Sequence, residues 1–194
     1  MVHLQKKSLR KKIKQKLEAL SVHDQSEKSG AITLHLVESD LWKNVEGILC
    51  FISMDDEVST AGIVKAALDQ GKAVAVPHMH GDEMDFHTIT SLDENWILHP
   101  YGVQEPRQEW PVFDPSLYEE GSVLMITPGL AFDRRGIRLG RGKGYYDRYV
   151  EKYCGILVSI AVCFSFQVVD QVPAAPHDCK VSCIVTENGI ISTE

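Results

Sequence analysis

The residues with the clearest chemical potential lie in one short stretch, PGLAFDRRGIRLGRGKGYYD, which covers residues 128–147. Glycine lets the backbone turn tightly and approach a ligand closely. Nearby cations and the free N–H groups at the start of a following helix favour a bound anion. The stretch therefore predicts a loop that binds phosphate groups. Its glycines and cations are Gly136, Gly140, Gly142, Gly144, Arg134, Arg135, Arg138, Arg141 and Lys143.

The spacing within this stretch differs from the two most familiar phosphate-binding motifs. A P-loop has Ser or Thr directly after its lysine, whereas Gly144 follows Lys143 here. A dinucleotide-binding fingerprint reads G-x-G-x-x-G, whereas residues 140–144 read G-x-G-x-G. A merely solvated loop, with glycines only as turn residues, has no need for so many glycines beside cations. We therefore expect a phosphate loop of another type.

A buried strand and a helix are expected on either side of this loop. The apolar run at residues 123–127 precedes it, and the helical pattern YYDRYVEKY begins at Tyr145. Other apolar runs predict strands at residues 47–52, 73–76, 86–92, 155–164, 181–185 and 190–191, the last two joined through Asn188 and Gly189. Helices are expected at residues 4–20, 24–39 and 60–70. This alternation predicts one α/β domain over residues 1–194 with a mostly parallel sheet.

Two further segments are expected to lie near the phosphate loop. In parallel sheets, ligands bind beyond the carboxyl ends of the strands. Glu57 follows the strand predicted at residues 47–52, so we expect it to face the same crevice; the alternative is a surface acid at a helix start. Lys6 and Arg10 share one face of the first helix and would reach a polyphosphate if that helix packs beside the loop. Otherwise its basic residues form a solvated face.

Composition limits the remaining functions. The net charge of −7 argues against general nucleic-acid binding, and no apolar run approaches the length of a membrane span. Five cysteines, an odd count without a secretion signal, indicate a reducing cytoplasm. His78 and His80 are interpreted as part of a solvated loop, and the proline-rich residues 100–115 as an ordered surface loop. The set His177, Cys179 and Cys183 matches no common zinc spacing.

Taken together, these motifs resemble the 5-formyltetrahydrofolate cyclo-ligase family, also called methenyltetrahydrofolate synthetases. The resemblance rests on KKSLR (6–10), SMDDEVST (53–60), VPAAPHDCKV (172–181) and above all PGLAFDRRGIRLGRGKGYYDRY (128–149). It implies a three-layer α/β/α sandwich in one domain and a cytoplasmic, monomeric enzyme. It also implies the reaction of EC 6.3.3.2, in which MgATP and 5-formyltetrahydrofolate give 5,10-methenyltetrahydrofolate, ADP and phosphate.

The resemblance further implies which residues form the site. Arg141, Lys143 and Tyr145 would serve the chemical step, and Asp147 and Asp178 would approach Mg²⁺. Folate would contact Ile52, Glu57, Arg141, Gly142, Lys143, Gly144 and Tyr145. ATP would contact Lys6, Lys7, Arg10, Arg138, Leu139, Gly140, Arg141, Gly142, Lys143, Gly144, Tyr145 and Tyr146.

One departure from the family pattern leaves alternatives open. The family usually has an acid where this chain has Ser182, four residues after Asp178. The serine implies weaker metal binding if that acid supports the metal, and no change if the acid is only structural. It also leaves open a non-catalytic member that binds folate or nucleotide. The basic first helix suggests a third possibility, an RNA- or polyanion-binding module, which the acidic total and the lack of aromatic stacking motifs disfavour.

Overall fold

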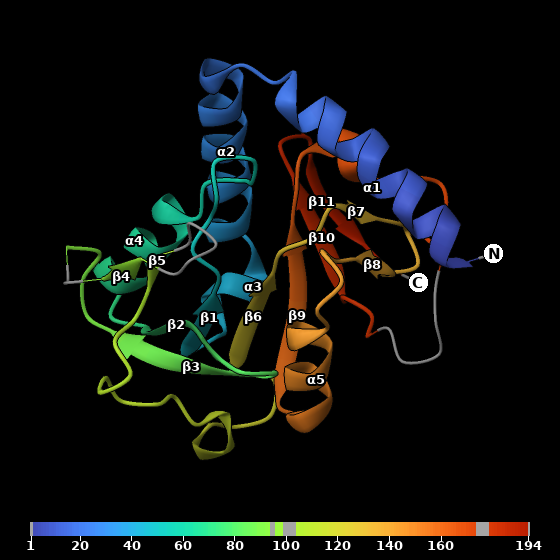
Figure 1. The fold of residues 1–194 in the computed structure, drawn as a ribbon. Helices are drawn as coiled ribbons and strands as arrows, with labels where there is room; N and C mark the ends of the chain where they lie inside the picture. Colours follow the sequence, from blue (N-terminus) through green and yellow to red (C-terminus); the bar gives the residue numbers. More distant parts are fainter. Residues whose placement is uncertain (1, 94–95, 99–103, 174–178, 194) are drawn as a thin grey trace.

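The fold is organised around a mostly parallel sheet, as the sequence predicts. The computed structural model describes residues 2–93, 96–98, 104–173 and 179–193. Within them a seven-stranded sheet has the order β11 (Gly189–Ser192), β10 (Cys183–Thr186), β9 (Leu157–Val162), β6 (Val123–Thr127), β1 (Gly47–Cys50), β2 (Ala73–His80) and β3 (Glu83–Ile89) (Figure 1). The strands from β10 to β2 run parallel, and the edge strands β11 and β3 are antiparallel to their neighbours.

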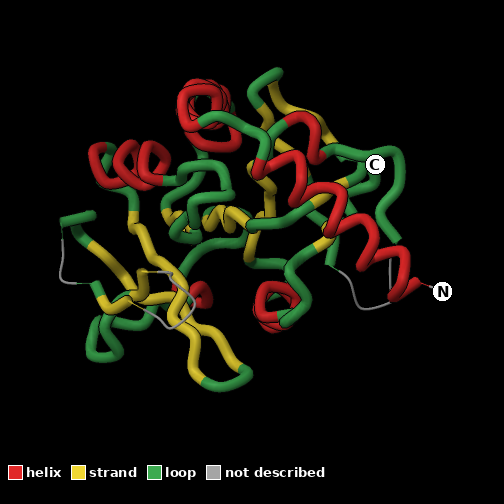
Figure 2. Tube along the Cα trace, turned by 45° about the horizontal axis from the view of Figure 1, so that its top comes forward, coloured by secondary structure: helices red, strands yellow, loops and turns green. Residues whose placement is uncertain are grey.

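Helices cover both faces of this sheet, which confirms the three-layer architecture (Figure 2). Because side chains alternate along a strand, Ile48 of β1 packs with one set of helices and Leu49 with the other. The side of Ile48 carries α1 (Val2–Glu18), α2 (Val22–Val37), α3 (Asp40–Lys43) and α4 (Ala61–Asp69). The side of Leu49 carries α5 (Tyr145–Lys152), whose Tyr149 is buried there.

Local signals account for several element boundaries. The hydroxyl of Ser21 accepts a hydrogen bond from the N–H of Asp24 at 3.1 Å, so Ser21 caps α2. Gly71, with φ +70°, follows α4 where the sequence indicated a helix end. Asn188 and Gly189 join β10 to β11 in an antiparallel pair, as predicted. The structure also contains the short 3₁₀ helices η1 (Pro115–Leu117) and η2 (Ser165–Gln167).

A small hairpin that the sequence did not predict lies inside the glycine-rich stretch. It consists of β7 (Ala131–Phe132) and β8 (Arg138–Leu139). Phe132 is fully buried and packs against Ala161 of β9 and Ile184 of β10. The first half of the predicted loop is therefore a packed element, and the exposed phosphate loop is confined to the residues after β8.

The histidine pair was interpreted wrongly. His78 and His80 lie on β2, which continues past Val76 and pairs with Asp85 and Glu83 of β3. The antiparallel partner satisfies the backbone of this extension, so it is a strand and not a solvated loop. Part of the predicted surface loop at 100–115 also forms a strand, β5 (Gln104–Glu105), which pairs with β4 (Ile97–Leu98); residues 100–103 lie outside the described residues.

Among the described helices, none is both long enough and apolar enough to cross a bilayer.

Candidate active site

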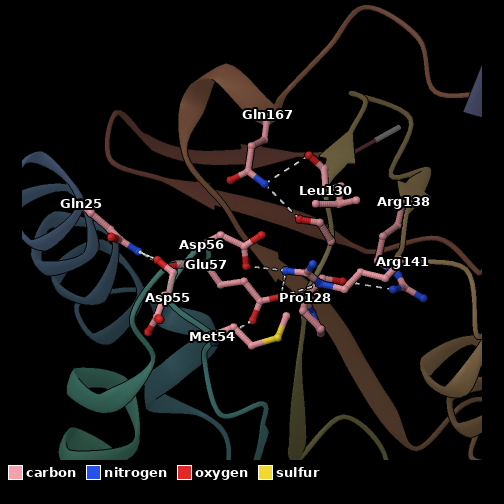
Figure 3. Close-up of polar contacts among 11 residues, drawn as sticks. Gln25, Met54, Asp55, Asp56, Glu57, Pro128, Leu130, Arg138, Arg141 and Gln167 are labelled. Atoms are coloured by element: carbon pink, nitrogen blue, oxygen red, sulfur yellow. Dashed lines mark hydrogen bonds and ion pairs between the residues drawn. The ribbon is translucent and has the colours of Figure 1, made fainter. Parts of the chain in front are cut away.

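The two predicted site loops meet because their strands are neighbours. β1 and β6 run parallel with Cys50 opposite Ile126, so the segments after them leave the same edge of the sheet. Nη2 of Arg141 donates to Oδ1 of Asp56 at 2.7 Å and to Oε1 of Glu57 at 3.0 Å (Figure 3). The expectation that Glu57 faces the glycine-rich loop is confirmed.

Glu57 is held in place by contacts on several sides. Its Oε2 accepts a hydrogen bond from the N–H of Met54 at 3.1 Å. Gln25 of α2 donates to the carbonyls of Asp55 and Glu57 at 2.7 and 2.8 Å, which fixes the backbone of the turn (Figure 3). The Glu57 side chain is only 14% exposed. Burial raises its pKa, and the hydrogen bond from Met54 and the charge of Arg141 oppose that shift without cancelling it. This carboxylate therefore favours additional N–H donors.

A cavity of only about 10 Å³ lies beside Glu57, lined by Phe51, Glu57, Val58, Pro128, Gly129, Val162 and Gln167. Gln167 donates through Nε2 to the carbonyls of Gly129 and Leu130 at 3.0 and 3.2 Å, so it fixes one wall (Figure 3). Ile52 lies two residues after β1 and is half-buried. This cavity holds about one water molecule and is far smaller than the few hundred Å³ of typical small-molecule sites, so a large ligand requires the surrounding side chains to move.

Arg138 braces the base of the phosphate loop. Its guanidinium donates to the carbonyl of Pro128 at 3.1 Å and to Oδ1 of Asp147 at 2.7 Å, and lies 5.6 Å from the ring centre of Tyr146. The side chain is only 7% exposed. Leu139 beside it is buried in the core. The sequence analysis predicted ATP contacts for Arg138, Leu139 and Tyr146. In the structure, the side chains of Arg138 and Leu139 contact other protein groups.

The first helix packs beside the loop. Nε of Arg10 donates to the carbonyl of Gly140 at 3.0 Å, although the two residues are 130 apart in sequence. Lys6 lies one turn earlier on the same helix and is half-buried, whereas Lys7 is exposed. α1 therefore brings Arg10 to the side of the loop, and Lys6 shares its face of the helix.

The turn from Gly142 to Gly144 presents Lys143 to solvent. Gly142 and Gly144 have φ angles of +112° and +72°, a region that disfavours other residues, and the Lys143 between them is exposed. Gly144 is the N-cap of α5 and supplies no side-chain capping bond, so the first N–H groups of the helix remain directed at the loop. In contrast, the hydroxyl of Tyr145 donates to the carbonyl of Gly81 at 2.8 Å, away from this turn.

The predicted metal ligands are only partly described. Asp147 lies in the first turn of α5, and Arg138 donates a hydrogen bond to its Oδ1. Asp178 and His177 lie outside the described residues. Among the side chains that the structure describes, no three His, Cys, Asp or Glu residues are grouped to hold a metal ion. The hydroxyl of Ser182 donates to the carbonyl of Ser159 on β9 at 2.8 Å, so this serine ties two strands together.

Asp133 is an important residue that the sequence analysis did not select. Its carboxylate is fully buried. It accepts hydrogen bonds from the N–H groups of Arg135, Ile137 and Val172 at 3.0, 3.2 and 2.9 Å, and from Nη2 of Arg135 at 2.6 Å. Burial acts to raise the pKa of Asp133, but these donors outweigh it and the pKa is lowered. Asp followed by Gly three residues later is a turn signal that could have identified it; nothing in the sequence indicated Gln25 or Gln167.

The sequence and the fold of this chain both match known proteins. The model of the 5-formyltetrahydrofolate cyclo-ligase family matches residues 2–187. The chain is 34% identical to the mouse 5-formyltetrahydrofolate cyclo-ligase over 200 residues, which covers 96% of each protein. It is 29% identical to the enzyme of the same name from Saccharomyces cerevisiae over 210 residues, with 96% of this chain and 97% of the yeast protein covered.

Two solved structures share the fold. The 5,10-methenyltetrahydrofolate synthetase from Aquifex aeolicus superposes with a TM-score of 0.81 at 28% identity, covering 96% of this chain and 92% of that one. The synthetase from Mycoplasma pneumoniae gives a TM-score of 0.74 at 25% identity, with 94% and 98% covered. On the match of nearly the whole chain to the family, this protein belongs to the 5-formyltetrahydrofolate cyclo-ligase family.

Proposed function

We propose that this protein converts 5-formyltetrahydrofolate and ATP into 5,10-methenyltetrahydrofolate, ADP and phosphate. The observation that carries the proposal is the position of Arg141, which joins the buried Glu57 beside one pocket to the exposed glycine turn at 142–144. The guanidinium of Arg141 thus lies between the carboxylate of Glu57, which accepts N–H donors, and the glycine turn, which binds phosphate. The names of the relatives support the same reaction.

The reaction has two steps that require positioning and charge neutralisation. The formyl oxygen attacks the γ-phosphorus of ATP, the bond from that phosphorus to the β–γ bridging oxygen breaks, and ADP departs. N10 then attacks the formyl carbon and loses its proton, and phosphate leaves with the former formyl oxygen. Neither step needs a nucleophilic side chain of the protein.

Each loop has a defined part in this scheme. Glu57, whose raised pKa reflects burial, accepts hydrogen bonds from the N–H groups of the pterin, and Ile52 contacts the ring. Arg141 and Lys143 neutralise the transferred phosphoryl group, assisted by the backbone N–H groups of Gly142, Gly144 and the start of α5. Lys6, Lys7, Arg10 and the carbonyl-anchored Gly140 flank the polyphosphate, and Tyr145 borders both substrates.

In this proposal, three of the residues that were expected to contact ATP instead support the phosphate loop from the protein side. Arg138 holds the loop in shape through Pro128 and Asp147, Leu139 anchors it in the core, and Tyr146 packs under the guanidinium. When bound with ATP, Mg²⁺ would reduce the negative charge on the phosphates. The carboxylates of Asp147 and Asp178 would suit an ion that keeps phosphate and water ligands and needs few carboxylates.

The proposal also includes a monomeric, one-domain protein of the cytoplasm. The five free thiols, which a reducing compartment preserves, support the cytoplasmic location. Size-exclusion chromatography with light scattering tests the monomer.

The test is an absorbance assay. Purified protein is mixed with 5-formyltetrahydrofolate and MgATP, and the near-ultraviolet band of the methenyl product is followed, with ATP omitted as the control and EDTA added in a third sample. ATP-dependent growth of the band supports the proposal, and its loss with EDTA supports the role of Mg²⁺. A flat trace from folded protein that still binds ATP would overturn the proposal in favour of a binding-only member of the family.

A further inference from the structure

Arg148 links the phosphate loop to a distant turn. It lies on α5, one turn after Gly144, and its Nη1 donates to the carbonyl of Lys143 at 3.0 Å. Its Nη2 donates to the carbonyl of Asp82, in the turn between β2 and β3, 66 residues away in sequence. The guanidinium also lies 5.2 Å from the ring centre of Tyr145. Neither the phosphate-loop prediction nor the reaction scheme above uses this arginine.

The turn between β2 and β3 receives a second contact from the same helix. The hydroxyl of Tyr145 donates to the carbonyl of Gly81 at 2.8 Å, so two consecutive carbonyls of the turn accept from two side chains of α5. Gly81 has φ +63°, the left-handed conformation that a two-residue hairpin turn requires. The long β2–β3 hairpin therefore provides a fixed support against which the start of α5 is held.

Lys143 needs such a support because its own backbone is free to move. Glycines on both sides, with φ angles of +112° and +72°, allow the peptide groups around Lys143 to rotate more than any other residue would. The described contact that holds its carbonyl is the hydrogen bond from Arg148. A Cβ on Gly144 would lie 3.0 Å from Nη1 of Arg148, so the glycine also makes room for this guanidinium.

We propose that Arg148 is a positioning residue that fixes the backbone of Lys143, so that its ammonium group points at the phosphate site before ATP arrives. This inference rests on the proposed function, because it assigns Arg148 to the same ATP site. Without Arg148, the turn at 142–144 samples several conformations, and ATP must select one at a cost in affinity. Arg148 is exposed, so its removal weakens ATP binding far more than it weakens the fold.

The first test compares Arg148→Ala with Lys152→Ala. Lys152 lies one turn further along α5, carries the same charge and has its ammonium 4.9 Å from the ring centre of Tyr153, so it is a matched control. We expect Arg148→Ala to raise the KM and Kd for ATP by about tenfold, equivalent to one or two lost hydrogen bonds, and Lys152→Ala to leave both unchanged. Arg148→Lys, which can reach only one of the two carbonyls, should give an intermediate value. Equal effects of the two alanine variants overturn the inference.

A double-mutant cycle tests whether Arg148 acts through Lys143. ATP affinity is measured for Arg148→Ala, Lys143→Ala and the double variant by calorimetry. If Arg148 acts mainly through Lys143, its removal costs much less once the lysine side chain is gone, because only its effect on the neighbouring backbone N–H groups remains. Additive losses would show that Arg148 contributes by another route and would contradict the proposal.

Hydrogen exchange of the unliganded protein gives a readout that does not depend on catalysis. We expect faster exchange at residues 142–144 in Arg148→Ala than in the wild type, with unchanged exchange at the end of α5. If Arg148→Ala does not fold, Arg148→Lys takes its place. A wild type without ATP-dependent product overturns the proposed function alone, whereas unchanged exchange at 142–144 overturns the role of Arg148.

Discussion

The guanidinium of Arg141 donates to Oε1 of Glu57 at 3.0 Å across 84 residues of sequence. In the proposed reaction each group is needed by a different substrate, the carboxylate by the folate and the cation by the phosphates. In this structure the two groups bind each other, so neither is available to a substrate until their contact breaks. Arrival of one substrate therefore releases the group that the second one requires, so the two substrates should bind with positive coupling.

Replacement of Glu57 should affect folate binding and ATP binding differently. Glu57→Gln keeps the shape of the side chain but loses the charge, so we expect the KM for 5-formyltetrahydrofolate to rise by at least about tenfold. The Kd for ATP should stay the same or fall, since Arg141 loses one of the two carboxylates that compete with phosphate for its guanidinium. Asp56→Asn is the matched control, because Asp56 also binds Arg141 but does not line the pocket. Steady-state kinetics and calorimetry measure both effects; an unchanged KM for folate in Glu57→Gln would remove Glu57 from the folate site.

Removal of the Lys143 ammonium should affect chemistry and not stability. We expect Lys143→Ala to lower kcat about a hundredfold to a thousandfold, the usual cost of losing one group that stabilises developing charge. Because Lys143 is exposed, the unfolding midpoint should stay the same. Lys65→Ala on α4 is the control, since Lys65 is an exposed lysine that forms an ion pair with Asp69 on the same helix. Turnover near the wild-type level in Lys143→Ala would count strongly against the proposed function.

Asp133 should contribute to stability in a pH-dependent way. Its pKa in the folded protein lies below the ordinary value of 3.8, so its stabilising effect is complete above that value and disappears as the pH falls through the folded pKa. We expect Asp133→Asn to lower the free energy of unfolding at pH 7 by about 2–4 kcal/mol, because several N–H donors lose a charged acceptor. The difference from the wild type should shrink below pH ~4.

Denaturant unfolding at pH 7 and at pH ~3 measures this difference. Asp69→Asn is the control, because Asp69 is an exposed member of an ion pair and should change stability by less than about 1 kcal/mol at either pH. Equal destabilisation of Asp133→Asn at both pH values would show that its hydrogen bonds do not depend on the charge.

Substitution of Ser182 tests whether position 182 has a structural role or supports the metal ion. Its hydroxyl donates to the carbonyl of Ser159, and an ionised carboxylate at this place would instead face that carbonyl without a donor. We expect Ser182→Asp to be less stable than Ser182→Ala in thermal unfolding, with the same apparent affinity for Mg²⁺ in the ATP-dependent assay. Tighter Mg²⁺ dependence in Ser182→Asp would show that this position does support the metal.

Much of the fold could be predicted from local sequence patterns. Continuous apolar runs predicted the parallel strands because a strand covered on both faces leaves no polar alternation. Ser21 and Gly71 marked helix ends because capping and left-handed turns depend on a few neighbouring atoms. The cationic, glycine-rich character of residues 140–144 was likewise evident, since it depends on residue type alone.

The tertiary structure decided which of these residues work together. Arg138 and Arg141 are three residues apart in the same motif, yet one braces the loop through Asp147 and the other meets Glu57. That division depends on β1 lying beside β6 and on the β7–β8 hairpin turning Arg138 inwards. The positions of His78 on a strand and of Arg148 against the β2–β3 turn depend on strand pairing in the same way. Such contacts join segments that only the packing of the whole chain brings together, so no local pattern of residues encodes them.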